Sequence, residues 1–209
     1  MKILIVDDHP LVRQGISHIL AGIGAVIDEA ANGAEALNKV SAHDFDLVLL
    51  DLSLPGRGGL EILKLLKKER PRLPVLVLTM HPEKQYAIRA MKAGAFGYVT
   101  KDCEPEKLIH VIEHIVRKGR YLSKKIMDLM AEDLSVLANG EPARHQRLSD
   151  REFQVACLIA SGRTVGQIAE DINLSVNTVS TYRTRLLAKL GMQTNAELVA
   201  YMVRKGLVG

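Results

Sequence analysis

Three carboxylates follow two β-rich segments in the first quarter of the chain. Asp7 and Asp8 come directly after the aliphatic run KILIV at residues 2–6, and Asp51 comes directly after FDLVLL at residues 45–50. Ligands bind beyond the carboxyl ends of the strands in open α/β sheets, so these carboxylates would meet there. Close carboxylates repel one another unless a cation holds them, and Mg²⁺ is bound in proteins by one or two carboxylates. A carboxylate beside Mg²⁺ can also attack phosphorus and form an aspartyl phosphate.

Two further polar residues come at the ends of later β-rich runs. Thr79 ends PVLVLT at residues 74–79, and Lys101 follows FGYVT at residues 96–100. The threonine hydroxyl could hydrogen-bond an added phosphoryl group, and the lysine ammonium could offset its charge. The alternative is that the aspartates only cap the helices that follow them. The coincidence of five such residues at the same ends of the strands favours a phosphoacceptor site.

Alternating strands and helices must position these residues. Segments with helical apolar spacing lie between and after the β-rich runs, and three of the runs are almost continuously aliphatic, as in a parallel sheet that is covered on both faces. The strands are expected at 2–6, 25–30, 45–50, 74–79 and 96–100, and the helices at 11–20, 34–40, 60–66, 87–91 and 108–116. The pattern predicts a doubly wound α/β domain with a five-stranded parallel sheet.

The rest of the chain is helical and more basic. Ser149 and Glu152 form a capping-box pattern, and further helical segments follow to the end of the chain. A short helix is expected before the turn signal Asn-Gly-Glu-Pro at 139–142. We therefore expect a first domain at 1–120, a linker with a short helix at 121–147, and a small all-α domain at 148–209.

Several motifs resemble a known family. The segments VDDHPLVRQG, LVLLDLSLPGRGGLE, PVLVLTMH and KAGAFGYVTKD resemble the receiver domain of bacterial response regulators, which has a flavodoxin-like fold. The segment LSDREFQVACLIASGRTVGQIAEDINLSVNTVSTYRTRLLAKLG resembles the LuxR-type helix-turn-helix. Together they resemble the NarL/FixJ family over almost the whole chain, apart from the linker.

The resemblance implies roles for particular residues. Asp51 would be the phosphoacceptor, with a sensor histidine kinase as the donor. Mg²⁺ would be held directly by Asp8 and Asp51, through water by Asp7, and by the backbone carbonyl of Ser53.

The same resemblance implies a switch. Thr79 would be the switch hydroxyl, Tyr98 the switch aromatic and Lys101 the phosphate-pairing lysine. For Tyr98 the alternative is an amphipathic residue on an edge strand. Phosphorylation would repack the surface around residues 83–99.

The motifs argue against an enzyme. A phosphatase that uses an aspartyl phosphate commonly needs a second Asp two residues on, and the chain has Asp51-Leu52-Ser53 there. It contains no GxxxxGK[ST] loop, and its histidines form no HExxH pair. The domain is better interpreted as a switch.

The stretch VNTVSTYRTRLLAKLG at 176–191 predicts a helix that reads DNA. Helical periodicity puts Val179, Tyr182, Leu186 and Leu190 on one face and small polar or basic residues on the other. We expect base-edge contacts from Ser180, Thr181 and Thr184, and a contact of Arg185 with a base or a flanking phosphate. The phosphate contacts are expected from Asn177, Thr178, Tyr182, Arg183 and Lys189. Many relatives carry Lys at the place of Ser180. The alternative is a helix of a protein-binding bundle in a signalling adaptor.

Composition narrows the partners and the location. Trp is absent and aromatic residues are 4%, which argues against a stacking platform for single strands. Cys103 and Cys157 lack metal-ligand spacing, and neither a signal segment nor a membrane span is apparent, so we expect a cytoplasmic protein.

The working hypothesis is a transcription factor controlled by phosphorylation. It would act as a homodimer when phosphorylated and would bind double-stranded DNA at inverted half-sites, with RNA polymerase as a further candidate partner. The rival within this hypothesis is a receiver that never takes up phosphate, with DNA binding controlled in another way.

Overall fold

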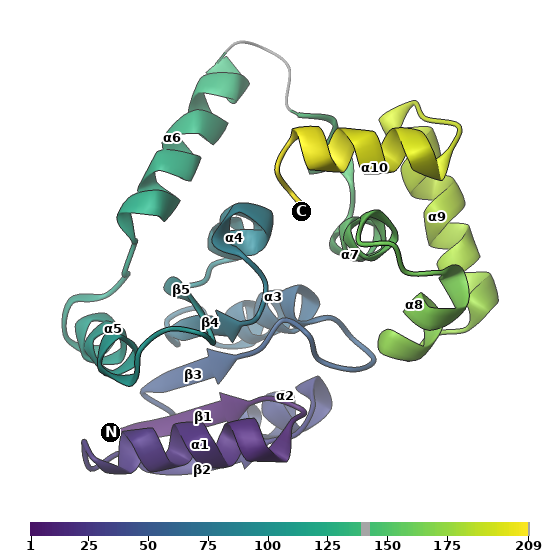
Figure 1. Ribbon diagram of the computed structural model, residues 1–209. Coiled ribbons are helices and arrows are strands. Elements are labelled where there is room, and N and C mark those ends of the chain that lie inside the picture. The colour runs from purple at the N-terminus through teal and green to yellow at the C-terminus, as the bar shows by residue number, and fades with distance from the viewer. Residues whose placement is uncertain (139–142, 209) are drawn as a thin grey trace. The chain divides into compact units, whose positions relative to one another are not determined.

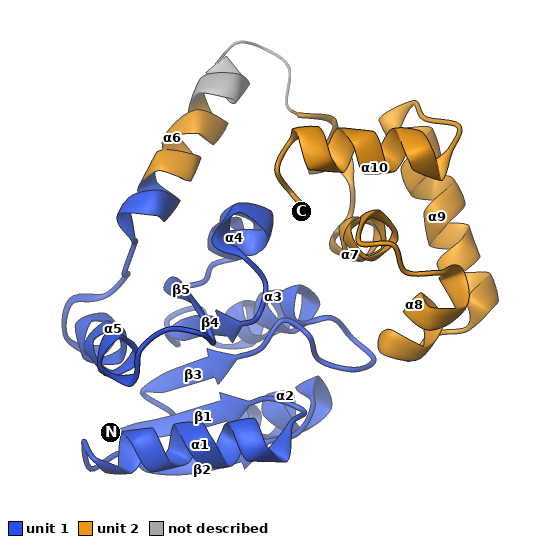
Figure 2. Cartoon of the chain, in the orientation of Figure 1, with its two compact units in different colours: residues 1–127 blue, residues 128–209 orange. Residues whose placement is uncertain are grey.

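The computed structural model describes residues 1–138 and 143–208, without the side chains of residues 135–138. The turn expected at 139–142 lies outside the described residues. The chain divides into a first unit, residues 1–127, and a second unit, residues 128–209 (Figure 2). No described helix is long and apolar enough to cross a membrane.

A five-stranded parallel sheet forms the centre of the first unit (Figure 1). Its order is β2-β1-β3-β4-β5, with every neighbouring pair parallel. The strands are β1 (Lys2–Val6), β2 (Val26–Ala30), β3 (Leu47–Leu50), β4 (Val75–Thr79) and β5 (Gly97–Thr100). The predicted doubly wound parallel sheet is confirmed. The aliphatic runs of β1, β3 and β4 are buried almost throughout because helices cover both faces of the sheet.

Helices alternate with these strands along the chain. They are α1 (Pro10–Ala21), α2 (Gly33–Ala42), α3 (Gly59–Glu69), α4 (Glu83–Lys92) and α5 (Pro105–Lys118). Helix α1 contacts α5, while α2 contacts α3 and α3 contacts α4, as expected for one helical layer on each face of the sheet. Helix α4 starts earlier than the apolar spacing predicted, because Pro82 stands at its N-cap and its first turn is polar.

Gly59 brings α3 against the end of β3. A Cβ atom at this position would lie 2.4 Å from the backbone oxygen of Asp51 and 2.5 Å from the Cα of Leu52. Neither backbone atom can move aside without displacing the strand end. The absence of a side chain at Gly59 therefore lets the helix pack directly behind Asp51.

The second unit is helical. Helix α6 (Lys124–Ala138) begins in the first unit and continues into the second, where a 3₁₀ helix η1 (Arg144–Arg147) and four α-helices follow. These are α7 (Asp150–Ala160), α8 (Val165–Asp171), α9 (Val176–Leu190) and α10 (Asn195–Arg204). The predicted capping box of Ser149 and Glu152 is present at the start of α7.

Side chains from all four helices form the core of the second unit. Phe153, Ile168, Leu186 and Met202 come from α7, α8, α9 and α10, and each is at most 1% exposed. Helix α9 ends at Gly191, which has a φ of 67° and so adopts the left-handed conformation that glycine tolerates best. This arrangement leaves one side of α9 for solvent.

Candidate phosphoacceptor site and DNA-reading helix

Two carboxylates and one ammonium meet at the carboxyl ends of the strands. Asp7 follows β1, Asp51 follows β3, and Lys101 follows β5. The Nζ atom of Lys101 lies 2.6 Å from Oδ2 of Asp7 and 2.7 Å from Oδ2 of Asp51. Both carboxylate side chains are 2% exposed, and that of Lys101 is 10% exposed. The sheet therefore brings together three of the predicted site residues in a nearly buried ion cluster.

The charge of Lys101 depends on these two partners. Burial alone would lower the pKa of the lysine, but the charges and hydrogen bonds of Asp51 and Asp7 raise it above its ordinary value. The ammonium form is thus favoured at neutral pH, and it is positioned to neutralise negative charge at Asp51.

Backbone groups hold the second oxygen of each carboxylate. The His9 N–H donates to Oδ1 of Asp7 at 2.9 Å, and the Ser53 N–H donates to Oδ1 of Asp51 at 3.2 Å. The guanidinium of Arg13 also donates to the backbone oxygen of Asp7 at 2.7 Å. The backbone hydrogen bonds thereby fix the orientation of the Asp7 and Asp51 carboxylates. The contact of Arg13 was not predicted from the sequence.

Asp8 presents a carboxylate oxygen that suits a metal ion. Its Oδ1 atom is buried and has no hydrogen-bond partner among the described residues, although His9 Nδ1 lies 2.9 Å away without forming a hydrogen bond. Asp7, Asp8 and His9 are close enough to one another to offer three ligand atoms to one ion. Asp51 is not part of this group and is joined to Asp7 through Lys101. An unsatisfied carboxylate oxygen among other carboxylates fits a hard cation such as Mg²⁺.

The predicted switch residues both contact His81, which sequence reasoning missed. Thr79 is fully buried, and its Oγ1 accepts a long hydrogen bond of 3.5 Å from the His81 N–H. Tyr98 is 1% exposed, and its hydroxyl donates to the backbone oxygen of His81 at 2.9 Å. Burial, with the charges of Glu83 and Asp51, raises the pKa of Tyr98, so its hydroxyl keeps its proton. Two residues from different strands therefore hold one position of the β4–α4 loop.

The His81 side chain also reaches the loop after Asp51. Its Nε2 lies 3.2 Å from Ser53 Oγ, and its ring lies 4.6 Å from that of Tyr86. Burial lowers the pKa of His81, and this effect exceeds the opposing effect of Asp51. The neutral imidazole is therefore favoured at pH 7. The available sequence signal was its place two residues after Thr79, at the same edge of the sheet.

Helix α9 presents the polar face predicted for it. Ser175 caps its first turn by accepting from the Thr178 N–H at 3.1 Å, and Val179, Leu186 and Leu190 are buried. Six predicted contact residues are exposed, namely Asn177, Ser180, Thr181, Thr184, Arg185 and Lys189, while Thr178, Tyr182 and Arg183 are half-buried. The hydroxyls of Thr181 and Thr184 donate to the backbone oxygens four residues earlier, at 2.9 and 3.1 Å. Their oxygens keep acceptor capacity toward solvent.

Two of the predicted phosphate-binding cations have partners within the unit. Lys189 Nζ lies 2.7 Å from Oε2 of Glu152, whose side chain is 5% exposed, and Arg183 Nε donates to Oδ1 of Asn195 at 2.7 Å. Burial would raise the pKa of Glu152, but the hydrogen bonds of Lys189 and Ser149 lower it. Sequence reasoning missed this pairing across 37 positions.

Known protein families match both the domain that holds Asp51 and the helical domain that contains α9. Residues 3–113 match the family described as response regulator receiver domain, and residues 146–202 match bacterial regulatory proteins of the luxR family. The response regulator UvrY of Escherichia coli O6:H1 is 36% identical over 99% of this chain and 95% of the relative. The response regulator GacA of Pseudomonas aeruginosa is 37% identical over 100% of this chain and 98% of the relative. The chain belongs to the NarL/FixJ family of response regulators.

Solved structures of this response regulator family give the same result. RcsB of Salmonella enterica serovar Typhimurium, bound to the rprA promoter in the presence of the phosphomimetic BeF3-, has a TM-score of 0.63. It is 28% identical, with 97% of this chain and 98% of that chain covered. The two family matches show that the present chain is a response regulator with a receiver domain and a LuxR-type DNA-binding domain. Members of this family are DNA-binding transcription regulators and not enzymes.

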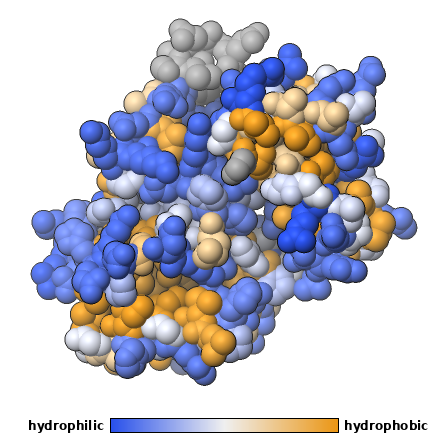
Figure 3. All heavy atoms as spheres, in the orientation of Figure 1, coloured by the Kyte–Doolittle hydropathy of each residue, from blue (hydrophilic) through white to orange (hydrophobic). Residues whose placement is uncertain are grey.

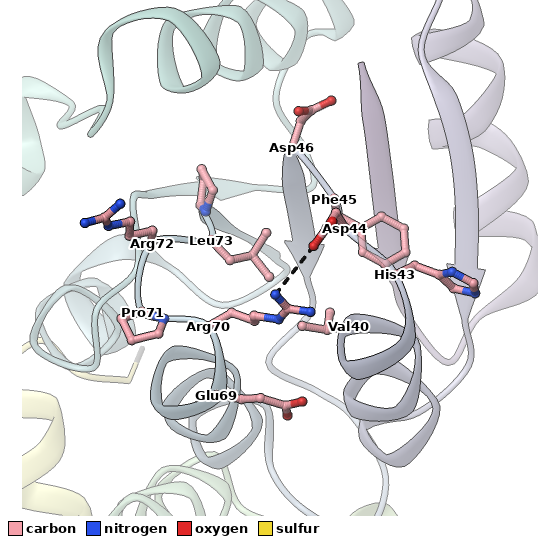
Figure 4. A pocket seen from close by; sticks show the side chains of 11 residues that line it. Val40, His43, Asp44, Phe45, Asp46, Glu69, Arg70, Pro71, Arg72 and Leu73 are labelled. Atoms are coloured by element: carbon pink, nitrogen blue, oxygen red, sulfur yellow. Dashed lines mark ion pairs between the residues drawn. The ribbon is translucent and has the colours of Figure 1, made fainter.

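A cavity of about 530 Å³ lies at the opposite ends of the strands (Figure 4). Asp46 precedes β3 and Pro74 precedes β4, while Arg70 and Asp44 form an ion pair of 3.5 Å across the cavity. Because Asp51 follows β3 at its other end, this cavity is separate from the candidate phosphoacceptor site.

Proposed function

We propose that Asp51 of this response regulator accepts a phosphoryl group and that the modification controls DNA binding by α9. The contact of Lys101 with Asp51 at 2.7 Å carries the proposal. An ammonium in contact with the acceptor can neutralise phosphoryl oxygens without first being brought into place. Thr79, buried at the end of the neighbouring strand β4, supplies a hydroxyl for the same oxygens.

Mg²⁺ is the cofactor that the oxygen ligands of the pocket fit. Asp8 and Asp51 would bind it directly, Asp7 through water, and Ser53 through its backbone carbonyl. When bound, the ion supplies positive charge beside the Asp51 carboxylate oxygen and the oxygens of the phosphoryl group that is transferred. The chain itself contributes fixed carboxylates, because backbone N–H groups hold the free oxygens of Asp7 and Asp51. Lys101 contributes the countercharge and Thr79 the hydroxyl.

The phosphodonor is proposed to be a sensor histidine kinase. Two hydrophobic side chains adjoin the loops of the pocket, since Leu11 is 81% exposed at the start of α1 and Met80 is 68% exposed directly after Thr79. Hydrophobic residues also gather over α1 in the space-filling view (Figure 3). Exposed apolar side chains around an acceptor suit docking of a protein donor.

The second half of the proposal concerns DNA. Helix α9 would enter the major groove, with Ser180, Thr181 and Thr184 toward base edges and Arg185 toward a base or a flanking phosphate. Asn177, Thr178, Tyr182, Arg183 and Lys189 would contact phosphates. Phosphorylation would favour a homodimer on inverted half-sites in the cytoplasm, where RNA polymerase is a further proposed partner. Of the two arginines among these proposed contacts, Arg185 is exposed and Arg183 is half-buried.

Intact-mass measurement tests the phosphoacceptor. The full chain is incubated with Mg²⁺ and acetyl phosphate, and the same reaction is run with Asp51→Ala. Wild type should gain the mass of one phosphoryl group and the variant should gain none. No gain in wild type, or the same gain in the variant, contradicts the proposal.

DNA binding is then measured with the same samples. Fragments retained from random double-stranded DNA by phosphorylated wild type should share an inverted repeat, and retention should fall steeply with salt. Retention that does not depend on salt, or no retention, would favour a protein-binding adaptor instead.

A further inference from the structure

Glu83 joins the first turn of α4 to the first turn of α6 within the first unit. One of its carboxylate oxygens accepts a hydrogen bond from Ser123 Oγ at 3.1 Å, and the other lies 3.6 Å from Lys125 Nζ. The Glu83 side chain is 15% exposed, whereas that of Lys125 is 63% exposed. Water therefore screens the lysine more than the carboxylate, and the hydrogen bond from Ser123 is the more specific of the two contacts.

Ser123 also starts α6. Its Oγ accepts from the Ile126 N–H at 3.2 Å, and its backbone oxygen accepts from the Met127 N–H at 3.0 Å. This is the N-cap arrangement, in which a side-chain oxygen satisfies an N–H group that the helix leaves unpaired. Ile126 is fully buried. Glu83 accepts a hydrogen bond from the same hydroxyl that caps the helix, so it orients the cap.

The residues that precede Glu83 in the chain contact Thr79 and Tyr98, the proposed switch residues. Glu83 begins α4 two residues after His81, whose N–H is held by Thr79 and whose backbone oxygen is held by Tyr98. If the Thr79 side chain rotates to donate its hydroxyl to a phosphoryl oxygen on Asp51, its oxygen moves away from the His81 N–H and the 3.5 Å hydrogen bond is lost. The segment that leads into Glu83 would then lose one of its two hydrogen bonds to the switch residues.

We propose that Glu83 couples the state of Asp51 to the start of α6. With Asp51 unmodified, Glu83 holds Ser123 and the first turn of α6, and phosphorylation weakens that contact. The inference rests on the proposed phosphorylation of Asp51. Because α6 continues from residue 127 into the second unit, the contact acts on the segment of chain that joins the two units (Figure 2).

Hydrogen exchange at the Ile126 and Met127 amides tests this coupling in the full chain. Phosphorylation with Mg²⁺ and acetyl phosphate should speed exchange at these amides about tenfold in wild type, which corresponds to the loss of one hydrogen bond. In Glu83→Ala, exchange should already be fast before phosphorylation, and phosphorylation should add little. In Glu83→Gln the effect should be smaller, because an amide oxygen still accepts from Ser123. Lys124→Ala, an exposed neighbour in the same turn, should behave as wild type.

Two outcomes overturn the coupling. One is equal exchange in unphosphorylated wild type and Glu83→Ala, and the other is equal acceleration of both proteins by phosphorylation. Intact mass, measured on the same samples, separates the two proposals. A wild type that takes up no phosphoryl group contradicts the proposed function, whereas a phosphorylated wild type with unchanged exchange contradicts the coupling alone. If Glu83→Ala fails to fold by circular dichroism, Glu83→Met, which removes both carboxylate oxygens and keeps a side chain of similar length, takes its place, and exchange equal to that of unphosphorylated wild type then overturns the coupling.

Discussion

The ammonium of Lys101 lies 2.7 Å from Oδ2 of Asp51, so the proposed phosphoacceptor has its countercharge in place before any phosphoryl group arrives. Asp7 shares the same ammonium at 2.6 Å. With side chains 2% exposed, the two carboxylates have lost most of their contact with water, and the ammonium that they share compensates their charge. This arrangement makes Lys101 a residue for stability as well as for signalling.

Lys101→Met is expected to lower the free energy of unfolding at pH 7 by about 3 kcal/mol, because it leaves two buried carboxylates without their cation. Urea unfolding followed by circular dichroism measures the change. Since the folded pKa of Lys101 is raised above 10.5, the wild-type contribution is present below that pH and is lost as the pH rises through the folded pKa. Lys107→Met, at an exposed position in α5, is the control. An equal loss in both variants would refute this role.

Acid is expected to weaken the link between Glu152 and Lys189. The pKa of Glu152 is lowered below 4.5 in the folded chain, so its contribution is present above pH 4.5 and is lost as the pH falls through the folded pKa. Lys189→Met should therefore reduce the melting temperature at pH 7 and make less difference at pH 3. The melting curves of wild type and variant across this range provide the test. A difference that does not change with pH would show that the ion pair contributes nothing.

Arg185→Ala should lower the slope of log affinity against log salt by about 1, because one phosphate contact releases about one counterion. Lys189→Ala should lower it less, since its ammonium already binds Glu152 at 2.7 Å. Fluorescence anisotropy with a selected DNA fragment measures both slopes. Arg117→Ala removes an equal charge from the end of α5 and should leave the slope unchanged. The assignment of α9 fails if all three variants give the same slope.

Thr184→Val should change sequence preference more than affinity. The Thr184 hydroxyl donates to the Ser180 backbone oxygen, so its oxygen faces outward as an acceptor, which suits the amino groups of adenine and cytosine. Loss of that acceptor should cost about 1 kcal/mol of discrimination at one base position per half-site. Parallel selection from random DNA with wild type and variant checks this. Thr181→Val gives an independent comparison, because its hydroxyl donates in the same way to Asn177. An unchanged consensus with both variants would contradict base contact by this face.

Local sequence patterns predicted the residues that lie at strand ends, on helix faces and at helix caps. Aliphatic runs followed by polar residues located Asp7, Asp51 and Lys101, because parallel strands share one carboxyl edge. The Ser149–Glu152 capping box was also readable, since its two partners are three positions apart.

Contacts between distant elements could not be predicted in this way. His81 is defined by hydrogen bonds to Thr79 and Tyr98, of which the second spans 17 positions. The bond between Glu83 and Ser123 spans 40 positions and involves no periodic signal. Helix α4 was predicted too short for a related reason, because apolar spacing marks only the buried residues from Tyr86 onward and not the polar first turn.

The charges around Asp51 have a consequence in thermodynamic linkage. The carboxylates of Asp7 and Asp51 share the ammonium of Lys101, and the carboxylate of Asp8 lies beside Asp7, so the three carboxylates outnumber the lysine charge before modification. A phosphoryl group on Asp51 would increase that surplus and with it the attraction for a divalent cation. Linkage is reciprocal, so a cation that favours the phosphorylated state must itself be retained more tightly in that state. The lifetime of the signal and the affinity for the ion would then be two measures of one free energy.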